Sequence, residues 1–357
     1  MTASGPGGDL AFKLPPRLIA QVPTKRRGDS RLLVLRRTTG VIEHGRFRDL
    51  PRYLEAGDLV VANESGVLPG RLFGTRKTGG RIEILLLDRL TPNGGGPRAL
   101  AERWTCLMRP ARRLRPGESI DLEGGLIGVV GKRDGEIGEI DLRGNRPPSL
   151  LVGRIGRTPL PPYIRRSRID PRESVDRRRY RTVYQRETGS AAAPTAGLHF
   201  TPGMLRRLSR AGVEWSTLLL HLGPASFLPV RGSDPDRQTV PPERFHLPGS
   251  TARRVELARR NGNRVLAIGT SSARVLEACR DPDGGLLPGK GSCDLFIRPG
   301  FRFGTIDALL TNFHLPGSTH LLLVAAFAGR DSILEAYRQA VRLEYRFYSY
   351  GDAMLIL

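Results

Sequence analysis

Long apolar segments, paired cysteines and lysine are all scarce in this chain of 357 residues. The longest apolar run, residues 321–328, is far too short to span a bilayer. Residues 1–16 contain no apolar signal core, so we expect no export. The three cysteines lack CxxC spacing, which fits neither a disulfide framework nor a thiolate zinc site. Reduced thiols in a cytoplasmic protein are the simple interpretation.

Several common catalytic signatures are missing as well. The sequence has no GxGxxG at a strand-to-helix turn and no GxxxxGK[ST], so neither a dinucleotide fold nor a P-loop enzyme is supported. It also has no GxSxG, which leaves a serine nucleophile without support. None of the six histidines belongs to an HxH or HExxH motif, and no carboxylates have a ligand spacing. We therefore predict no metal site.

Positive charge is abundant and comes almost entirely from arginine. The formal net charge is +22 and the sequence pI is about 11.1, and lysine occurs only at positions 13, 25, 77, 132 and 290. A polyanionic partner such as nucleic acid fits this balance. A genome rich in G and C would also favour arginine, glycine and proline, so composition alone leaves both explanations open.

Arginine is concentrated in residues 109–117 and 165–181. Side chains in such loops and on a short helix can reach phosphate groups. We take Arg177, Arg178 and Arg179 as candidate contacts to nucleic-acid phosphates. A solvated surface is the alternative for both segments.

The pattern of predicted strands changes along the chain and indicates two domains, as the chain length also suggests. Residues 31–47 alternate like a hairpin, and residues 58–63 read as a strand buried on both faces. From about Gly70, short strands follow one another at intervals of about ten residues, a spacing typical of a small antiparallel barrel. We predict an α/β main domain with a mixed sheet, formed by residues 1–69 and 151–357. An inserted small antiparallel β-barrel domain would occupy residues 70–150.

Three strand-to-helix corners carry most of the candidate chemistry. In residues 193–202, Thr201 reads as an N-cap before Pro202, and in residues 309–319 Ser318 caps an apolar helix. A third corner lies in residues 264–280. The N-terminus of a helix after such a corner is suited to binding an anion. Because ligands of α/β sheets bind where strands end, we expect one shared cleft.

Four residues at these corners and near the carboxyl end could act on a substrate. His199 and His314 each lie in a loop bounded by glycine or proline, although a lone loop histidine is more often structural. Asn312 could orient a hydroxyl or an amide, or be an ordinary turn residue. The carboxylate of Asp352 could bind an amine or act as a base, or simply form a cap or salt bridge.

These motifs also carry a resemblance to a known family. The chain resembles the S-adenosylmethionine:tRNA ribosyltransferase-isomerases of queuosine biosynthesis, and the likeness extends over nearly its whole length. The similar segments include LPPRLIAQVP (14–23), GDLVVANESGVLPGRLFG (57–74), YRTVYQRETGSAAAPTAGLHF (180–200), GTSSARVLE (269–277), TNFHLPGST (311–319) and YRFYSYGDAML (345–355).

The resemblance implies an enzyme with the same two-domain layout that uses S-adenosylmethionine as a ribosyl donor. The acceptor would be the amine of 7-aminomethyl-7-deazaguanine in the tRNA anticodon, and the product would be epoxyqueuosine-tRNA, adenine and methionine. No cofactor is implied, because S-adenosylmethionine is a co-substrate. His199 is our candidate base or acid, followed by Asp352 and His314. The candidate contacts to the methionine carboxylate or ribose are Thr195, Thr270, Ser271 and Arg274.

The sequence departs from the family pattern in three places. Gly66 replaces an arginine in NESGV (63–67), and a glycine-rich turn reads HLGPASFLPV (221–230). The family's His-x-Met-His-x-Glu stretch reads RQTVPPERF (237–245), where only Glu243 matches. We predict that Glu243 points into the cleft as a substrate contact. Arg237 and Gln238 would have no proton-transfer role, because neither titrates near neutral pH.

Two other functions stay open at this point. A diverged paralogue could use S-adenosylmethionine with a different deazapurine acceptor, which the altered stretch at 237–245 would accommodate. A non-catalytic basic RNA-binding protein is the third hypothesis, although a binding protein has no need of the corner motifs.

Overall fold

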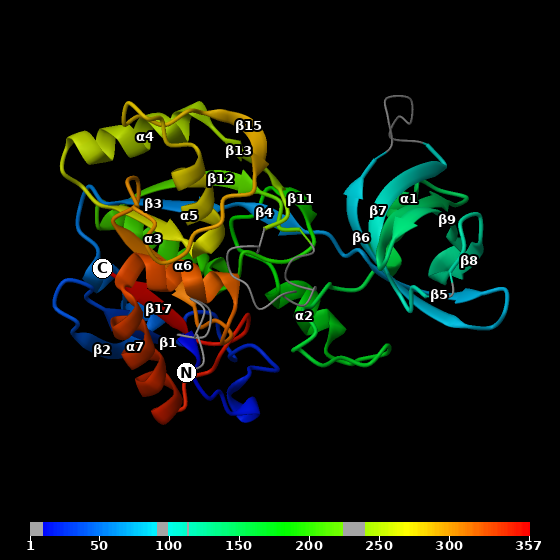
Figure 1. Cartoon of the computed structure of the whole chain (residues 1–357), viewed down its shortest axis with the longest axis horizontal. Helices are drawn as coiled ribbons and strands as arrows, with labels where there is room; N and C mark the ends of the chain where they lie inside the picture. Colours follow the sequence, from blue (N-terminus) through cyan, green and yellow to red (C-terminus); the bar gives the residue numbers. More distant parts are fainter. Residues whose placement is uncertain (1–9, 91–98, 113, 224–239) are drawn as a thin grey trace, which may run out of the picture. The chain divides into compact units, whose positions relative to one another are not determined.

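The computed structural model of the chain describes residues 10–90, 99–112, 114–223 and 240–357. Its contacts divide the chain into two compact units (Figure 1). The first, here called the sheet unit, comprises Met1–Ser65, Thr182–Glu187 and Pro194–Leu357. The second, the barrel unit, comprises Gly66–Arg181 and Thr188–Ala193. No helix among the described residues is long and apolar enough to cross a membrane.

A nine-stranded sheet forms the centre of the sheet unit, in the order β15-β13-β12-β3-β14-β16-β17-β1-β2. Strands β12, β3, β14 and β16 are parallel neighbours, whereas β13, β15, β17 and β2 each have an antiparallel neighbour. The strands are β1 (Arg31–Leu35), β2 (Ile42–Arg46), β3 (Leu59–Asn63), β12 (Glu214–Leu220), β13 (Glu243–Leu247), β14 (Val265–Ile268), β15 (Gly289–Cys293), β16 (Ala308–Asn312) and β17 (Ala353–Ile356).

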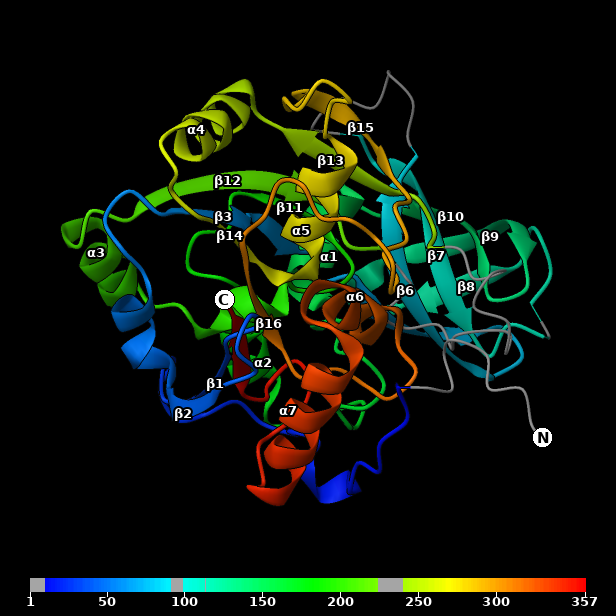
Figure 2. The same cartoon turned by 60° about the vertical axis from the view of Figure 1, so that its left-hand side comes forward.

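Helices cover both faces of this sheet (Figure 2). They are η2 (Pro16–Leu18), η3 (Phe47–Tyr53), η5 (Thr195–His199), α3 (Pro202–Arg210), α4 (Gly249–Arg260), α5 (Gly269–Ala278), α6 (Thr319–Ala328) and α7 (Arg330–Arg342). One core cluster joins alternate strand residues such as Val60 and Ala62 to side chains of η3, η5 and α3. Helices α4 and α5 pack on β12, β3 and β14 without contributing to that cluster, so they cover the opposite face.

Local sequence signals account for most of these elements. Residues 59–63 and 308–312 are mainly apolar and wholly buried, as expected of strands covered on both faces. The predicted caps are confirmed: the Thr201 hydroxyl accepts from the Met204 N–H at 3.0 Å, and the Ser318 hydroxyl accepts from Leu321 at 3.2 Å. The segment after the first hairpin forms the 3₁₀ helix η3, and Pro51 inside it cannot donate a helical hydrogen bond.

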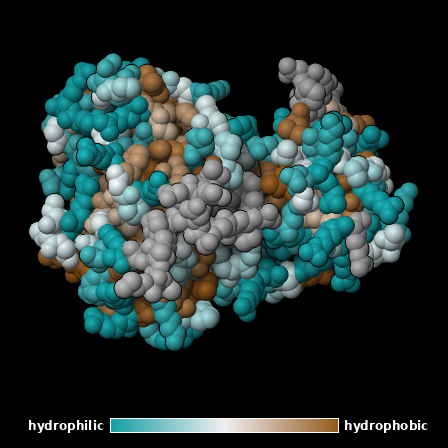
Figure 3. All heavy atoms as spheres, viewed as in Figure 1, coloured by the Kyte–Doolittle hydropathy of each residue, from teal (hydrophilic) through white to brown (hydrophobic). Residues whose placement is uncertain are grey.

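The barrel unit contains a closed antiparallel barrel in the order β10-β7-β6-β5-β8-β9. Its apolar core also includes Leu151 and Val152 from α1. In Figure 3, hydrophilic residues cover most of the visible face of this unit. The elements from Ser65 to Ser190 are β4 (Ser65–Val67), β5 (Arg71–Arg76), β6 (Arg81–Arg89), β7 (Ala101–Arg109), β8 (Ser119–Leu122), η4 (Glu123–Gly125), β9 (Ile127–Asp134), β10 (Ile137–Arg143), α1 (Pro148–Ile155), α2 (Glu173–Arg179) and β11 (Glu187–Ser190). The predicted fold class, a mixed α/β sheet with an inserted antiparallel barrel, is confirmed.

Candidate functional site

The candidate residues gather where the parallel strands end, an edge of the sheet that we call the carboxyl edge. Strands β12, β3 and β14 end just before His221, Glu64 and Gly269, and Asn312 is the last residue of β16. Strand β17 runs antiparallel to β16, so Asp352 reaches the same edge. The edge beyond the carboxyl ends of parallel strands is where open α/β sheets bind their ligands.

His199 is buried at this edge, with 6% of its surface exposed. Its Nδ1 lies 2.6 Å from the Ser30 hydroxyl, and its Nε2 lies 3.3 Å from the side-chain nitrogen of Asn312. The ring stacks on Phe47, with 5.0 Å between centroids. The imidazole is thus fixed by polar contacts at both nitrogens and by packing on one face, rather than lying in an open polar loop as the sequence suggested.

The side chain of Asn312 determines the tautomer of His199. Its Nδ2 donates to the Tyr348 carbonyl oxygen at 3.0 Å, a contact that only the amide nitrogen can make. The same nitrogen therefore faces Nε2 of His199, which accepts and stays unprotonated while Nδ1 carries the proton toward Ser30. The oxygen Oδ1 of Asn312 is buried without a hydrogen-bond partner. An unused acceptor in this position is available to a substrate group.

The helix η5, which carries His199, packs closely on its neighbours. A Cβ atom at Gly197 would overlap the Tyr184 hydroxyl, so glycine is required for this approach. Gly269, with φ of +82°, lets the chain turn from β14 into α5 beside Ala196. Thr195 is half-buried in η5, and Thr270 and Ser271 are buried in the first turn of α5. The predicted corner residues therefore meet at the carboxyl edge.

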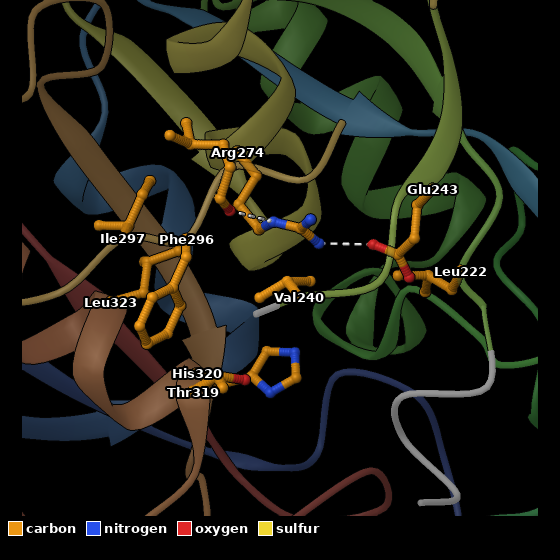
Figure 4. A pocket seen from close by; sticks show the side chains of 10 residues that line it. Leu222, Val240, Glu243, Arg274, Phe296, Ile297, Thr319, His320 and Leu323 are labelled. Carbon is orange, nitrogen blue, oxygen red and sulfur yellow. Dashed lines mark hydrogen bonds and ion pairs between the residues drawn. The ribbon is translucent and has the colours of Figure 1, made fainter. Parts of the chain in front are cut away.

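Arg274 and Glu243 form a buried ion pair in a pocket at the same edge (Figure 4). Arg274 Nη1 lies 2.5 Å from Glu243 Oε2, and the two side chains are 11% and 5% exposed. The other carboxylate oxygen accepts from the Gly223 N–H at 2.8 Å. Arg274 also donates to the carbonyl oxygens of Leu295 and Cys293, at 3.0 and 3.1 Å. Three of its five N–H donors thus have partners in the part of the chain that the structure describes.

The rest of this pocket is mainly apolar. Its volume of about 40 Å³ has room for a few water molecules. His320 lies across the pocket from the ion pair in Figure 4. The remaining lining residues are Leu222, Val240, Leu295, Phe296, Ile297, Thr319 and Leu323. Glu243 lines this pocket and pairs with Arg274, while its role as a substrate contact stays a prediction.

His320 stacks on His314 at 5.2 Å between ring centroids. Burial, with a smaller contribution from Arg274, lowers the pKa of His320 to about 4. Burial followed by the charge of His320 holds the pKa of His314 well below its usual value. His314 is further fixed by Thr311, whose hydroxyl lies 2.7 Å from Nε2, and by the Tyr337 hydroxyl, which accepts its backbone N–H. Both rings are therefore neutral at pH 7.

The low pKa of His320 makes stability depend on pH. Between pH 6.5 and about 4 the unfolded chain binds a proton at this residue that the folded chain does not, so stability falls as the pH falls. We expect the free energy of unfolding to be lower by about 2 kcal/mol at pH 5 than at pH 7 from this group. Urea titrations of the wild type and His320→Asn measure it, with His246→Gln as the control. An equally steep decline in His320→Asn would contradict the prediction.

Asp352 is fully occupied by donors of the chain. Its Oδ1 accepts from the Arg31 N–H at 2.8 Å, and its Oδ2 accepts from the Arg346 N–H at 2.8 Å and from Arg31 Nε at 3.2 Å. The side chain is 2% exposed. These contacts join the start of β1 to the turn before β17, which favours a positioning role over that of a base.

The basic segment at 165–181 is ordered by internal contacts of the barrel unit. Arg166 and Asp176 form a buried bidentate pair at 2.6 and 3.0 Å. Arg177 donates to the carbonyl oxygens of Gly153 and Gly156, at 3.1 and 2.7 Å, and so caps the end of α1. Arg178 is exposed and Arg179 is half-buried. Of the three candidate tRNA contacts, Arg177 thus has a structural role within its own unit.

Some predictions concern residues that the structure does not describe. Other residues of the site, Ser30 and His320, carried no recognisable signal in the sequence. Arg237, Gln238 and most of the altered 221–230 turn lie outside the described residues. Ser30 lies 169 positions from its partner His199, and His320 follows the helix cap without any motif of its own. Among the described residues, no three histidine, cysteine, aspartate or glutamate side chains are grouped as a metal site requires.

Comparison with known proteins identifies the family. The profile described as queuosine biosynthesis protein matches residues 8–356. An S-adenosylmethionine:tRNA ribosyltransferase-isomerase of Pelobacter propionicus is 47% identical over 349 residues, 98% of each chain, and one of Thermotoga maritima is 46% identical over 98% of this chain and 99% of its own. The crystal structure of a Thermotoga maritima S-adenosylmethionine tRNA ribosyltransferase covers 98% of this chain and 100% of its own, with 36% identity and a TM-score of 0.54. The chain belongs to the queuosine biosynthesis protein family.

Proposed function

We propose that this protein is an S-adenosylmethionine:tRNA ribosyltransferase-isomerase that works in the cytoplasm, where its tRNA acceptor is found. It transfers the ribosyl group of S-adenosylmethionine to the amine of 7-aminomethyl-7-deazaguanine at the wobble position of tRNA. Isomerisation of that group gives epoxyqueuosine-tRNA, and adenine and methionine leave. S-adenosylmethionine is consumed as a co-substrate, and the scheme needs no metal or redox cofactor.

The pocket around Arg274 suits the methionine end of S-adenosylmethionine. Two N–H donors of Arg274 have no partner among the described residues, enough for a carboxylate, and Glu243 holds the guanidinium in place. The apolar lining can contact the methionine carbons. The neutral His320 adds no positive charge beside the cationic sulfonium. Thr195, Thr270 and Ser271 lie at helix N-termini of the same edge and are proposed contacts to the ribose.

His199 is the proposed base for the first step. The sulfonium acidifies the adjacent ribose carbon, so a positioned base can remove its proton and start the loss of adenine. Asn312 and Ser30 hold His199 with Nε2 unprotonated, the form that can accept a proton. The 3.3 Å contact from Asn312 is long enough to yield to a substrate. Asp352 then positions β1, which carries Ser30 at its start, and His314 supports His320.

The observation that carries this proposal is the convergence of the family's corner motifs on one edge of the sheet. The decisive experiment incubates the protein with S-adenosylmethionine and tRNA bearing 7-aminomethyl-7-deazaguanine, then measures adenine release. We expect release that requires both substrates. Release with a small deazapurine but not with the tRNA would favour the paralogue with another acceptor. No release with either acceptor, while tRNA still binds, would favour a non-catalytic RNA-binding protein.

Replacement of the α2 arginines tests the tRNA contact. If Arg178 and Arg179 meet phosphates, changing both to alanine weakens tRNA binding and flattens its salt dependence by about one unit of slope for each lost contact. Adding Arg177→Ala lowers the melting temperature as well, because the carbonyls of Gly153 and Gly156 lose their donor. Affinity for S-adenosylmethionine should not change. An unaltered salt slope in the double variant would leave this run as a solvated surface.

A further inference from the structure

Several buried polar atoms at the carboxyl edge have no hydrogen-bond partner in the described part of the chain. Of the seven such atoms among the described residues, five come from Glu64 (Oε2), Thr182 (Oγ1), Tyr184 (hydroxyl), Gln185 (Oε1) and His221 (Nδ1). We call these five residues the unpaired cluster. Each unsatisfied buried group costs about 1–3 kcal/mol, and native proteins keep few of them. Their concentration on three short segments therefore calls for an explanation.

The three segments of the unpaired cluster are adjacent in the fold. The backbone of Glu64 accepts from the Arg186 N–H and donates to the Leu218 carbonyl oxygen, both at 2.9 Å. His221 follows β12, and its Nε2 lies 3.2 Å from the carboxylate of Glu187. Glu64 thus lies between the segment 182–187 and the end of β12. The cluster occupies the carboxyl ends of β3 and β12, beside the residues already assigned to the reaction.

The chemistry of the unpaired atoms specifies the ligand. The carboxylate of Glu64 and the side-chain oxygen of Gln185 can only accept hydrogen bonds. Glu64 Oε2 forms a loose ion pair with Nε of Arg186 at 3.5 Å, but the Arg186 side chain is 78% exposed to solvent. Nε2 of His221 faces the carboxylate of Glu187, and its Nδ1 is buried without a partner. A ligand with several N–H donors would satisfy the acceptors of Glu64 and Gln185.

We infer that Glu64 and Gln185 recognise the acceptor base through its N1–H and 2-amino donors, the edge that distinguishes a guanine-like base from one without the amino group. This inference rests on the proposed function, whose acceptor has that edge. A carboxylate facing two adjacent N–H donors forms a bidentate contact. Enzymes that modify a base extrude it and read the exposed Watson–Crick edge in this manner. Glu64 and Gln185 are therefore specificity-determining residues for the acceptor.

The test compares two acceptor tRNAs, one with 7-aminomethyl-7-deazaguanine and one with the analogue lacking the 2-amino group. Wild-type kcat/KM should fall by about 10- to 100-fold on loss of this group. Glu64→Gln and Gln185→Leu should each lower kcat/KM for the complete acceptor by a similar factor and discriminate less than about threefold between the two tRNAs. Glu214→Gln, an exposed site at the amino end of β12, is the control and should behave as the wild type.

The outcomes separate this inference from the proposed function. Variants that lose activity yet keep the full wild-type discrimination have a merely structural defect, which would overturn the inference. If the wild type shows no turnover, the proposed function fails, and calorimetry with the free base 7-aminomethyl-7-deazaguanine decides the inference alone. Binding by the wild type that Glu64→Gln weakens at least tenfold supports it. Equal binding of the free base by the wild type and Glu64→Gln, or no binding by the wild type, overturns the inference. If Glu64→Gln does not fold, Gln185→Leu is measured in its place.

Discussion

His199→Ala should lower kcat by about two orders of magnitude or more while the protein stays folded, the range for loss of a general acid or base. The reason is geometric: His199 is the buried imidazole of the carboxyl edge whose Nε2 is held unprotonated by its neighbours. Adenine release under saturating S-adenosylmethionine and tRNA gives kcat, and a thermal melt reports folding. Removing a ring packed on Phe47 also lowers the melting temperature, so both measurements are needed.

Two further variants separate chemistry from packing at this site. Ser30→Ala removes the partner of Nδ1 and should cost less than His199→Ala, because the ring can still accept a proton after reorienting. His199→Gln keeps polar atoms near Asn312 without a titratable group, and should be as inactive as the alanine variant. Full turnover in a folded His199→Gln protein would remove His199 from the chemistry and leave it a structural residue.

Local patterns allowed the main elements to be predicted from sequence. The short apolar run at 59–62 favours a strand covered on both faces, and Thr201 and Ser318 mark helix starts through hydrogen bonds within three residues. Their positions at strand ends were enough to predict a shared cleft. Each of these signals depends only on residues close in sequence, so it can be recognised before the fold is known.

Long-range partners determine the roles that sequence could not predict. Ser30 and His199 are 169 residues apart, and Asp352 meets a donor 321 residues away. The sequence around a loop carboxylate such as Asp352 does not show whether other groups of the protein donate hydrogen bonds to it. The exposed run at Arg177 likewise gave no sign that its guanidinium caps α1. Function at these positions depends on which donors the fold brings near, and no local spacing encodes that.

Breaking the ion pair between Arg274 and Glu243 should lower both the folding stability and the affinity for S-adenosylmethionine. Arg274→Met leaves a carboxylate that is 5% exposed with one remaining donor, the Gly223 N–H. Removing one partner of a buried pair costs about 3–5 kcal/mol of folding stability. Urea denaturation of the variant should show a loss of that size, and the KM for S-adenosylmethionine should rise by about tenfold or more because the proposed carboxylate contact is gone.

The double variant Arg274→Met/Glu243→Met distinguishes the effect of the ion pair on folding stability from its effect on substrate binding. Two apolar side chains leave no unpaired buried charge, so we expect recovery of about half or more of the lost stability. Recovery stays incomplete because the carbonyl oxygens of Leu295 and Cys293 still lack their donor. The KM for S-adenosylmethionine should remain high, since no cation is restored.

A matched pair at the opposite edge of the sheet provides the control. Arg264 and Asp58 approach to 2.5 Å just before β14 and β3 begin, far along these strands from the pocket. Arg264→Met should lower stability without changing the KM for S-adenosylmethionine. If the double variant at Arg274 and Glu243 regained a normal KM together with its stability, the ion pair would be a structural contact only. Methionine would then have to be bound by other groups, and Glu243 would lose its place in the substrate site.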